Sequence, residues 1–458
     1  MKRIIPVGLF VLSLVLPGRS LCAAEPTSAL AAYVAAPDDS FVWVKRREGK
    51  LGESSYVELT LTSQTWRDIV WKHQLFIIRP KQVRNPAQGL LLIAGGSWRE
   101  ELAAPLDGKQ ADDKAAKLPR EASLLASLAA AIGSPVAILL HVPQQPIFGD
   151  MREDEIISYT FEQYLKTGDA TWPLLLPMVK SAVRGMDAVQ QFAEREWQMK
   201  IERFTVTGAS KRGWTTWLTA AVDARVRALA PMVIDVLNIA AQMKHQEATW
   251  GKFSEQIDDY SKRGIQAHLD TKPGRQLLGI VDPYSYRQSL VQPKLILLGA
   301  NDRYWTLDAL NLYWNDLEGE KHVLYVPNQG HSLADPQRVI GSIAAFHRHS
   351  VGELTLPKLD WKLANGDGAL KLNLKSSAEA AHALAWIASS PTRDFREATW
   401  KSEKLELVDG AYRYALPLPE SGYAAMFGEL KFDGNSLPYY LSTNVQIAPA
   451  PNQENTQK

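Results

Sequence analysis

Six short strand-like segments, most of them almost wholly apolar, constrain the fold of this chain more than any other feature. They are residues 90–94, 135–142, 204–207, 226–234, 294–298 and 323–326. Strands that are apolar along their whole length are buried on both faces, which is typical of a parallel sheet with helices on either side. Functional side chains in such a sheet lie at the carboxyl ends of its strands.

Segments with a helical spacing of apolar residues separate or follow these strands. They are residues 123–132, 172–193 and 337–347. Two earlier segments, 56–61 and 74–78, are rich in β-forming residues and predict strands ahead of the parallel sheet. Apolar residues make up 46% of the 458-residue chain and charged residues 22%, which excludes a wholly disordered or coiled-coil protein. We predict an α/β domain over residues 25–350.

The pattern changes after residue 351, where apolar and polar residues begin to alternate singly. The alternation is clearest at Leu370, Leu372 and Leu374. Short alternating segments bounded by turn-forming pairs such as Asp409-Gly410 are typical of an antiparallel sandwich. We predict a small immunoglobulin-like β-sandwich over residues 351–448 and a disordered tail over residues 449–458.

The first 24 residues have the pattern of a targeting signal. Lys2 and Arg3 precede an apolar run over residues 4–16, and small residues follow at positions 23 and 24. The run is shorter than the roughly 20 residues that a membrane span needs. We predict a cleavable signal peptide over residues 1–24, and therefore a periplasmic or secreted protein without a stable membrane span. Cleavage would remove Cys22, the single cysteine, so disulfides are not expected.

Charge and motif content exclude several classes of partner. The 51 basic and 50 acidic residues are balanced, whereas nucleic-acid binding usually leaves a basic excess. The sequence lacks an H-E-x-x-H segment, a paired-cysteine motif, a dinucleotide fingerprint and a P-loop. We therefore predict no metal and no cofactor, and a small molecule or peptide as substrate. No pattern in the sequence predicts the oligomeric state.

A candidate nucleophile lies where a predicted strand runs into a predicted helix. In the segment 204–213, Ser210 stands between small residues, with Gly208 before it and Gly213 after it. A sharp strand-to-helix turn projects such a serine from the sheet and directs the following amides at a developing oxyanion. The usual G-x-S-x-G pattern has its last glycine one position earlier than Gly213. An N-cap serine on a core helix is the alternative interpretation.

A serine nucleophile needs a base and an acid from other strand ends. His331 follows the last predicted strand, and Asp302 follows the strand before it. Asp235, after the segment 226–234, is the alternative acid. The chain order Ser210, Asp302, His331 is that of the α/β-hydrolase fold. We expect the oxyanion to be bound by the amide of Lys211 and by an amide of Gly96 or Ser97.

Aromatic residues near these elements predict a substrate pocket. They are Trp98, Trp214, Tyr304 and Trp305. Two long insertions, residues 148–172 and 241–280, are expected to form a lid over the strand ends. Lys211 and Arg212 suggest either an anionic substrate or a solvated pair of charges.

Several segments together resemble the PhoPQ-activated pathogenicity-related protein family, a branch of the α/β hydrolases. They are residues 38–43, 71–76, 95–97, 208–214, 233–238 and 301–305. The resemblance covers about residues 30–350 and implies an exported hydrolase-fold protein with Ser210, Asp302 and His331 as its triad, but it implies no particular substrate. We therefore expect a serine hydrolase that cleaves an ester. The alternatives are a peptidase on the same fold and a non-catalytic binding or signalling protein.

Overall fold

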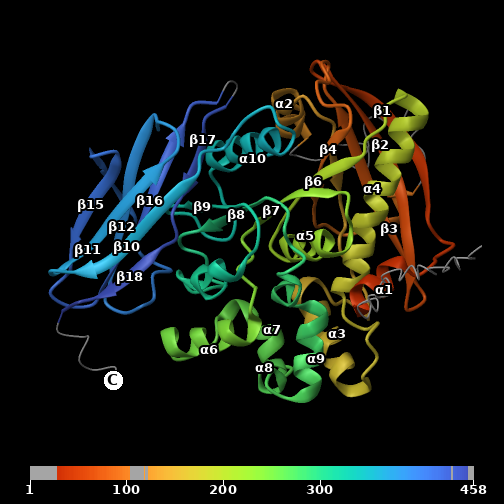
Figure 1. Cartoon of the computed structure of the whole chain (residues 1–458). Helices are drawn as coiled ribbons and strands as arrows, with labels where there is room; N and C mark the ends of the chain where they lie inside the picture. Colours follow the sequence, from red (N-terminus) through yellow and green to blue (C-terminus); the bar gives the residue numbers. More distant parts are fainter. Residues whose placement is uncertain (1–27, 104–117, 119–121, 435–436, 452–458) are drawn as a thin grey trace, which may run out of the picture.

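A sheet that extends through the whole molecule organises the computed structural model (Figure 1). The structure describes residues 28–103, 118, 122–434 and 437–451, so the predicted signal segment 1–24 lies outside the described residues. Among the described helices, none combines the length and apolar character that crossing a membrane requires.

The strands are β1 (Val42–Leu51), β2 (Ser54–Trp66), β3 (Ile69–Arg79), β4 (Gln88–Ile93), β5 (Val136–Leu139), β6 (Arg203–Ala209), β7 (Val226–Met232), β8 (Lys294–Gly299), β9 (Lys321–Val326), β10 (Leu359–Gly366), β11 (Ala369–Ser376), β12 (His382–Ser390), β13 (Lys401–Lys404), β14 (Glu406–Val408), β15 (Ala411–Pro417), β16 (Tyr423–Phe432), β17 (Tyr439–Ser442) and β18 (Gln446–Pro449). The α-helices are α1 (Ala29–Ala35), α2 (Ala122–Ile132), α3 (Glu153–Thr167), α4 (Leu175–Trp197), α5 (Lys211–Val222), α6 (Ile239–Trp250), α7 (Asp258–Ser261), α8 (Ile265–His268), α9 (Lys272–Val281) and α10 (Pro336–Ser350).

The six predicted strand segments form the parallel centre of this sheet. Strand β4 pairs in parallel with β5 on one side and β6 on the other, and β7, β8 and β9 follow in order. Strands β1, β2 and β3 extend the sheet antiparallel beyond β5. The predicted α/β-hydrolase fold, with a mostly parallel sheet and helices on both faces, is therefore confirmed.

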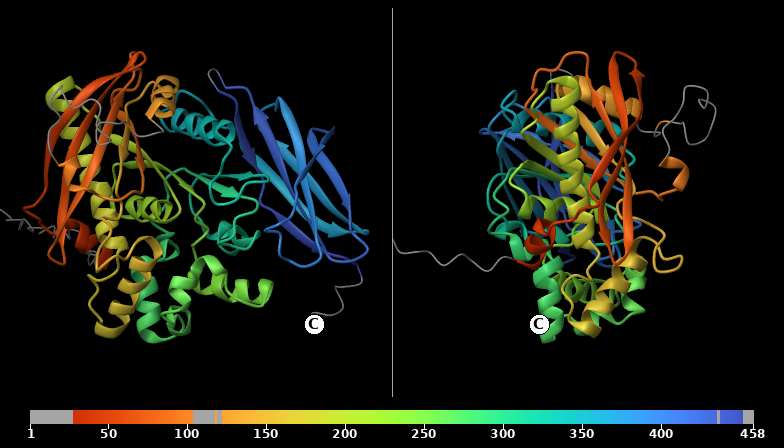
Figure 2. Two further views of the ribbon diagram at one scale, coloured as in Figure 1. Left: turned by 180° about the vertical axis from the view of Figure 1, so that it is seen from behind. Right: turned by 90° about the vertical axis from the view of Figure 1, so that its right-hand side faces the viewer.

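Alternate side chains of the parallel strands enter two separate cores, one on each face of the sheet. In β5, Val136 and Ile138 pack in the core that contains α2 and α10, whereas Ala137 and Leu139 pack in the core that contains α4 and α5. Since both faces bury apolar side chains, these strands read as continuous apolar segments. Helices α3 and α6–α9 instead gather at one end of the sheet (Figure 2).

The C-terminal region forms the predicted sandwich, but one of its two sheets continues the central sheet. Strands β17, β16, β12 and β13 follow β9, and the first of these pairings joins Ser442 to Val323. The second sheet, in the order β10-β11-β15-β14, packs its leucines on the first. The predicted start of the tail is wrong, because Pro449 pairs with Tyr423 and Ala450 is fully buried. The rest of that tail, from residue 452, lies outside the described residues.

Helix α10 attaches the sandwich to the α/β domain through a very close contact. The Ser342 hydroxyl donates to the Tyr440 carbonyl at 3.0 Å and accepts from the Tyr440 amide at 2.9 Å. At Gly341, a Cβ atom would lie only 2.0 Å from the carbonyl oxygen of Pro438. A side chain at this position would therefore displace backbone.

We expect Gly341→Ala to destabilise the protein by about 1–3 kcal/mol, because the added methyl group overpacks this contact. Gly279→Ala is the matched control, since Gly279 is an exposed helical glycine with open space around its Cβ position. That control should gain roughly 0.5–1 kcal/mol from helix propensity. Urea unfolding of the two variants measures both effects, and equal effects of the same sign would contradict the contact.

Candidate active site

Ser210 occupies the turn between β6 and α5 in a backbone conformation that few non-glycine residues adopt. Its φ is 57° and its ψ is −131°. The amide of Ser210 donates to the Met232 carbonyl at 2.8 Å, and its carbonyl accepts from the Trp214 amide at 3.0 Å. The predicted strand–turn–helix arrangement therefore lies around this serine, and its strained backbone is typical of a functional position.

Two glycines allow the turn to close. A Cβ atom at Gly208 would lie 2.7 Å from the Arg212 carbonyl oxygen, and one at Gly213 would lie 2.9 Å from the Gly208 carbonyl oxygen. Gly213 thus provides the close helix–strand packing, even though it stands one position later than in the usual pattern.

Asp302 and His331 are brought together by their loops. The imidazole Nδ1 lies 2.9 Å from Asp302 Oδ2, while Oδ1 accepts the Tyr304 amide at 2.9 Å. Gly299 permits this approach, since a Cβ there would lie 2.5 Å from the Gly330 carbonyl oxygen. The ring of Tyr304 stacks on the imidazole with centroids 4.2 Å apart. The carboxylate is thus fixed through both of its oxygens and orients the ring.

The other ring nitrogen of His331, Nε2, is buried and has no hydrogen-bond partner within the described part of the chain. His331 and Ser210 line the same cavity, but their side chains are not hydrogen bonded in this conformation. Catalytic hydrogen bonds are often long without substrate and shorten when it binds.

Asp235, the alternative acid, occupies a different environment. Its side chain is buried, and its Oδ1 atom has no hydrogen-bond partner among the described residues. Burial, with the negative charges of Asp302 and Asp308, raises the pKa of Asp235 to about 7. No hydrogen bond joins Asp235 to His331 within the described residues, so Asp302 is the carboxylate that contacts the imidazole.

The cavity beside Ser210 and His331 has about 730 Å³ of empty space, including its opening to solvent. Most of its wall is apolar, and half of the residues that line it belong to the two predicted lid insertions. Their contributions include Phe161, Met243, Ile257, Tyr260, Leu269 and Leu277. These segments correspond to α3 and α6–α9, which lie together beyond the carboxyl ends of the strands (Figure 1).

Three of the four predicted pocket aromatics line this cavity, and one does not. Trp214, Tyr304 and Trp305 belong to its wall. Trp98 instead packs edge-on against His141, with centroids 5.9 Å apart, and its indole N–H donates to Glu100 at 3.1 Å. Its prediction as a pocket residue therefore differs from the structure, because the indole lies against His141, just after β5, and under the ammonium of Lys72 in β3.

Glu153, which the sequence analysis did not identify, binds both basic residues that follow Ser210. Its carboxylate accepts from both terminal nitrogens of Arg212, at 2.7 and 2.8 Å, and lies 3.0 Å from Lys211 Nζ. Lys211 also pairs with Asp154 at 3.0 Å. Burial alone would raise the pKa of Glu153, but the bonds and charges of Arg212 and Lys211 hold it at about 2. These cations are buried and paired, so they are neither solvated nor free for a substrate.

The predicted oxyanion loop is connected to the same network. The Gln145 amide nitrogen donates to Glu153 at 2.7 Å and to the Gly96 carbonyl at 3.0 Å. The Ser97 hydroxyl accepts from Arg152 at 2.6 Å. Lys211 belongs to the cavity wall described above, whereas Gly96 and Ser97 do not. Their role in binding an oxyanion stays a prediction.

We expect Glu153→Gln to destabilise the protein by about 2 kcal/mol, because it leaves buried Arg212 without its anionic partner while the site keeps some solvent contact. Glu53→Gln is the control, since its pair with Lys81 is exposed and should contribute under about 1 kcal/mol. Guanidinium unfolding compares the two variants. A loss no larger in Glu153→Gln than in the control would show that the network is not stabilising.

Two esterases are among the solved structures that this chain matches at low sequence identity. Acetyl xylan esterase 1 from Thermoanaerobacterium sp. JW/SL YS485 is 14% identical, with a TM-score of 0.42, over 66% of this chain and 86% of that chain. A glucuronoyl esterase from Solibacter usitatus is 14% identical, with a TM-score of 0.40, over 71% of this chain and 91% of that chain.

Sequence comparison gives a much stronger relationship. Autocrine proliferation repressor protein A from Dictyostelium discoideum is 31% identical to this chain, and the match covers 94% of this chain and 92% of that protein. The model of the PhoPQ-activated pathogenicity-related protein family matches residues 30–396. The chain therefore belongs to the PhoPQ-activated pathogenicity-related protein family.

Proposed function

We propose that this protein is an exported serine hydrolase that cleaves a carboxylic ester, with Ser210 as nucleophile, His331 as base and Asp302 as the orienting acid. The contact of 2.9 Å between His331 and Asp302, beside the cavity that Ser210 also lines, carries this proposal. Export rests on the signal-like pattern of residues 1–24.

The reaction takes two similar halves. The Ser210 oxygen attacks the ester carbonyl carbon, and its proton passes to His331 Nε2. The negative oxygen is stabilised by backbone amides, for which Lys211 and Gly96 or Ser97 are the candidates. Collapse of this intermediate breaks the ester C–O bond, and His331 protonates the leaving alcohol. Water, deprotonated by His331, then attacks the acyl-enzyme, and the acid leaves as Ser210 regains its proton.

Asp302 holds the ring in the tautomer that this transfer needs. A carboxylate at Nδ1 keeps a proton there, so that Nε2 presents its lone pair toward the serine, and it stabilises the imidazolium once formed. Tyr304 supports the ring from one face. Burial, with the nearby carboxylates of Asp154 and Asp302, raises the pKa of Tyr304 to about 12, so its hydroxyl stays neutral.

We expect Ser210→Ala to abolish labelling by a fluorophosphonate and to lower kcat for 4-nitrophenyl butyrate by at least about 10³-fold. Asp302→Asn should lower kcat by about 10³–10⁴-fold, because it favours the wrong tautomer of His331. Asp235→Asn is the matched control at a neighbouring strand end and should keep kcat near that of the parent. Steady-state kinetics on folded variants measures all three.

Unchanged ester turnover in Ser210→Ala would contradict the proposal. A parent protein that neither reacts with the fluorophosphonate nor turns over any ester of a panel would favour a non-catalytic binding protein. Faster turnover of peptide anilides than of matched esters would assign a peptidase instead.

The charge of the cavity predicts a preference among acyl groups. Its charged wall residues are Asp154 and Lys211, and both belong to a network in which the cations Lys211 and Arg212 balance the carboxylates of Glu153 and Asp154. No wall cation is therefore left to pair with an anionic acyl group, which would lose its hydration against a mostly apolar wall. We expect kcat/KM for 4-nitrophenyl butyrate to exceed that for the anionic 4-nitrophenyl hemisuccinate by about tenfold or more, a difference of about 1.4 kcal/mol.

Asp154→Asn should reduce this discrimination, whereas Glu162→Gln, on the same helix but outside the cavity wall, should leave it unchanged. Equal turnover of the two esters by the parent protein would contradict the inferred charge preference.

A further inference from the structure

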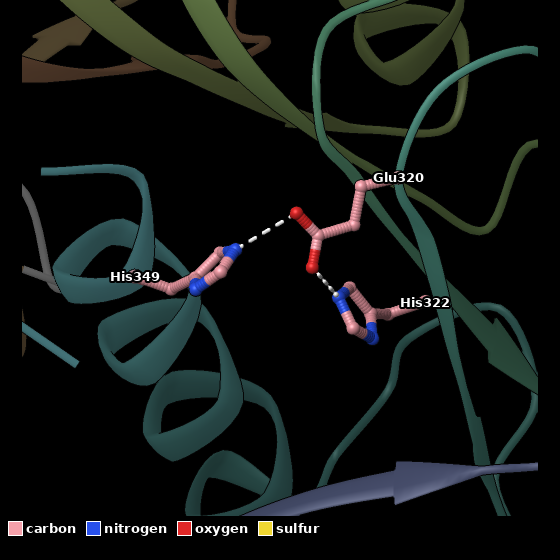
Figure 3. A group of neighbouring side chains, drawn as sticks. All are labelled: Glu320, His322 and His349. Carbon is pink, nitrogen blue, oxygen red and sulfur yellow. Dashed lines mark hydrogen bonds and ion pairs between the residues drawn. The ribbon is translucent and has the colours of Figure 1, made fainter. Parts of the chain in front are cut away.

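A second cluster of polar side chains lies away from Ser210, on the side of the parallel sheet where the strands begin rather than end. Glu320 precedes β9, His322 lies at the start of that strand, and His349 belongs to the last turn of α10 (Figure 3). The proposed catalytic residues follow the carboxyl ends of their strands, whereas this cluster lies at the amino end of β9. The proposed reaction therefore makes no use of it.

Both imidazoles direct Nε2 at the same carboxylate (Figure 3). His322 Nε2 lies 3.0 Å from Glu320 Oε1, and His349 Nε2 lies 3.0 Å from Glu320 Oε2. One ligand atom from each residue lies within 4.8 Å of the others. Neighbouring ligands of a tetrahedral zinc ion, with bonds of about 2.0–2.2 Å, are separated by roughly 3.3 Å. Small side-chain rotations would therefore bring all three to coordination distance.

The far nitrogen of His349 is held as it is in many metal sites. Its Nδ1 atom accepts from the Leu356 amide at 3.2 Å and also lies 3.2 Å from the Leu354 carbonyl oxygen. With Nε2 bound to a metal, Nδ1 carries the proton and donates it to the Leu354 carbonyl, and the Leu356 amide gives up its bond to Nδ1. A backbone carbonyl behind a ligating imidazole fixes its tautomer and the orientation of its ring.

The cluster also opens onto space that solvent can enter. Glu320 and His322 line a cavity with about 770 Å³ of empty space, whose wall includes Trp361 and Ser442 from the sandwich. Lys321 belongs to the same wall, but its ammonium donates to the Trp314 and Leu317 carbonyls, at 2.6 and 2.9 Å. Water can thus occupy a fourth coordination position.

We propose that Glu320, His322 and His349 bind a divalent transition-metal ion of the zinc class, with water from the adjacent cavity as a further ligand. Two imidazoles and one carboxylate suit zinc, copper and nickel better than calcium or magnesium, which prefer oxygen ligands. An ion here would tie the start of β9 to the end of α10, next to the pairing of Val323 with Ser442 that joins the sandwich to the sheet. We infer a structural metal at this junction.

The alternative is a hydrogen-bonded cluster that binds no metal, and tautomers distinguish the two. Without a metal, neutral imidazoles can donate to Glu320 only through Nε2–H. With a metal, the Nε2 lone pairs bind the ion and the protons move to Nδ1. No linear sequence motif describes this arrangement, since Glu320 and His322 lie two positions apart at the start of β9 and His349 comes from a separate helix.

The test uses the full chain, stripped with a chelator and titrated with Zn²⁺ by calorimetry. We expect one equivalent to bind with a Kd below about 10 μM and to raise the melting temperature, because the ion binds only the folded chain. Glu320→Gln, His322→Gln and His349→Gln should each weaken binding at least tenfold. His382→Gln, an exposed histidine of β12, and His331→Gln, in the proposed active site, should leave binding unchanged.

A second measurement, the visible absorption of bound Co²⁺, uses only the parent protein and so does not depend on whether a variant folds. Co²⁺ added to the stripped parent should give the visible absorption of a tetrahedral or five-coordinate ion, and Zn²⁺ should abolish it. Absence of Zn²⁺ uptake and of this spectrum would overturn the proposal, as would binding retained in all three ligand variants. Loss of binding in His331→Gln alone would place the ion at the proposed active site and would equally overturn it.

Discussion

The carboxylate of Glu153 connects three parts of the candidate active site that come from distant segments of the chain. Glu153 is the first residue of α3, and its carboxylate binds both basic residues at the start of α5. Gln145 connects the same carboxylate to the Gly96 carbonyl in the loop after β4. Buried arginine and lysine side chains are stable only when paired, so the position of α5 depends on that of α3. The helix that forms part of the cavity wall is thereby fixed to the helix that follows Ser210.

This network also explains why glycine stands at positions 95 and 208, since both positions lie against Arg212. A Cβ at Gly95 would lie 2.6 Å from the Arg212 guanidinium, and one at Gly208 would lie 2.7 Å from the Arg212 carbonyl oxygen. Arg212 therefore fills the space that both glycines leave. The residue that interrupts the usual serine motif is thus the one around which the neighbouring loops are packed.

Much of the fold could be predicted from the sequence, because strands that are buried on both faces are apolar along their whole length. Part of the site could be predicted as well, because its residues follow the carboxyl ends of such strands. Strand β1 could not, since it lies at an edge, with Val42 and Val44 half-exposed among charged residues. Asp235 and Asp302 both follow strands, so their positions in the sequence could not show which of them contacts His331. In the structure it is Asp302. Glu153 and the cluster around Glu320 depend on partners distant in sequence, which periodicity does not reveal.

Because the central sheet continues into the sandwich, its edge strands, which carry unpaired backbone amides and carbonyls, are β1 and β13. In many sheets the last parallel strand offers a free row of amides and carbonyls, but β17 lies beside β9, pairs with it at Val323 and Ser442, and accepts the Tyr325 amide through the Ser442 hydroxyl. The described sheet instead terminates in β13, which has only four residues, Lys401–Lys404, all of them polar or charged and all exposed. The opposite margin, β1, has a bulge between Lys45 and Arg47. Short, charged or kinked margins discourage strand addition from a neighbouring molecule, so this architecture protects the protein against edge-to-edge aggregation.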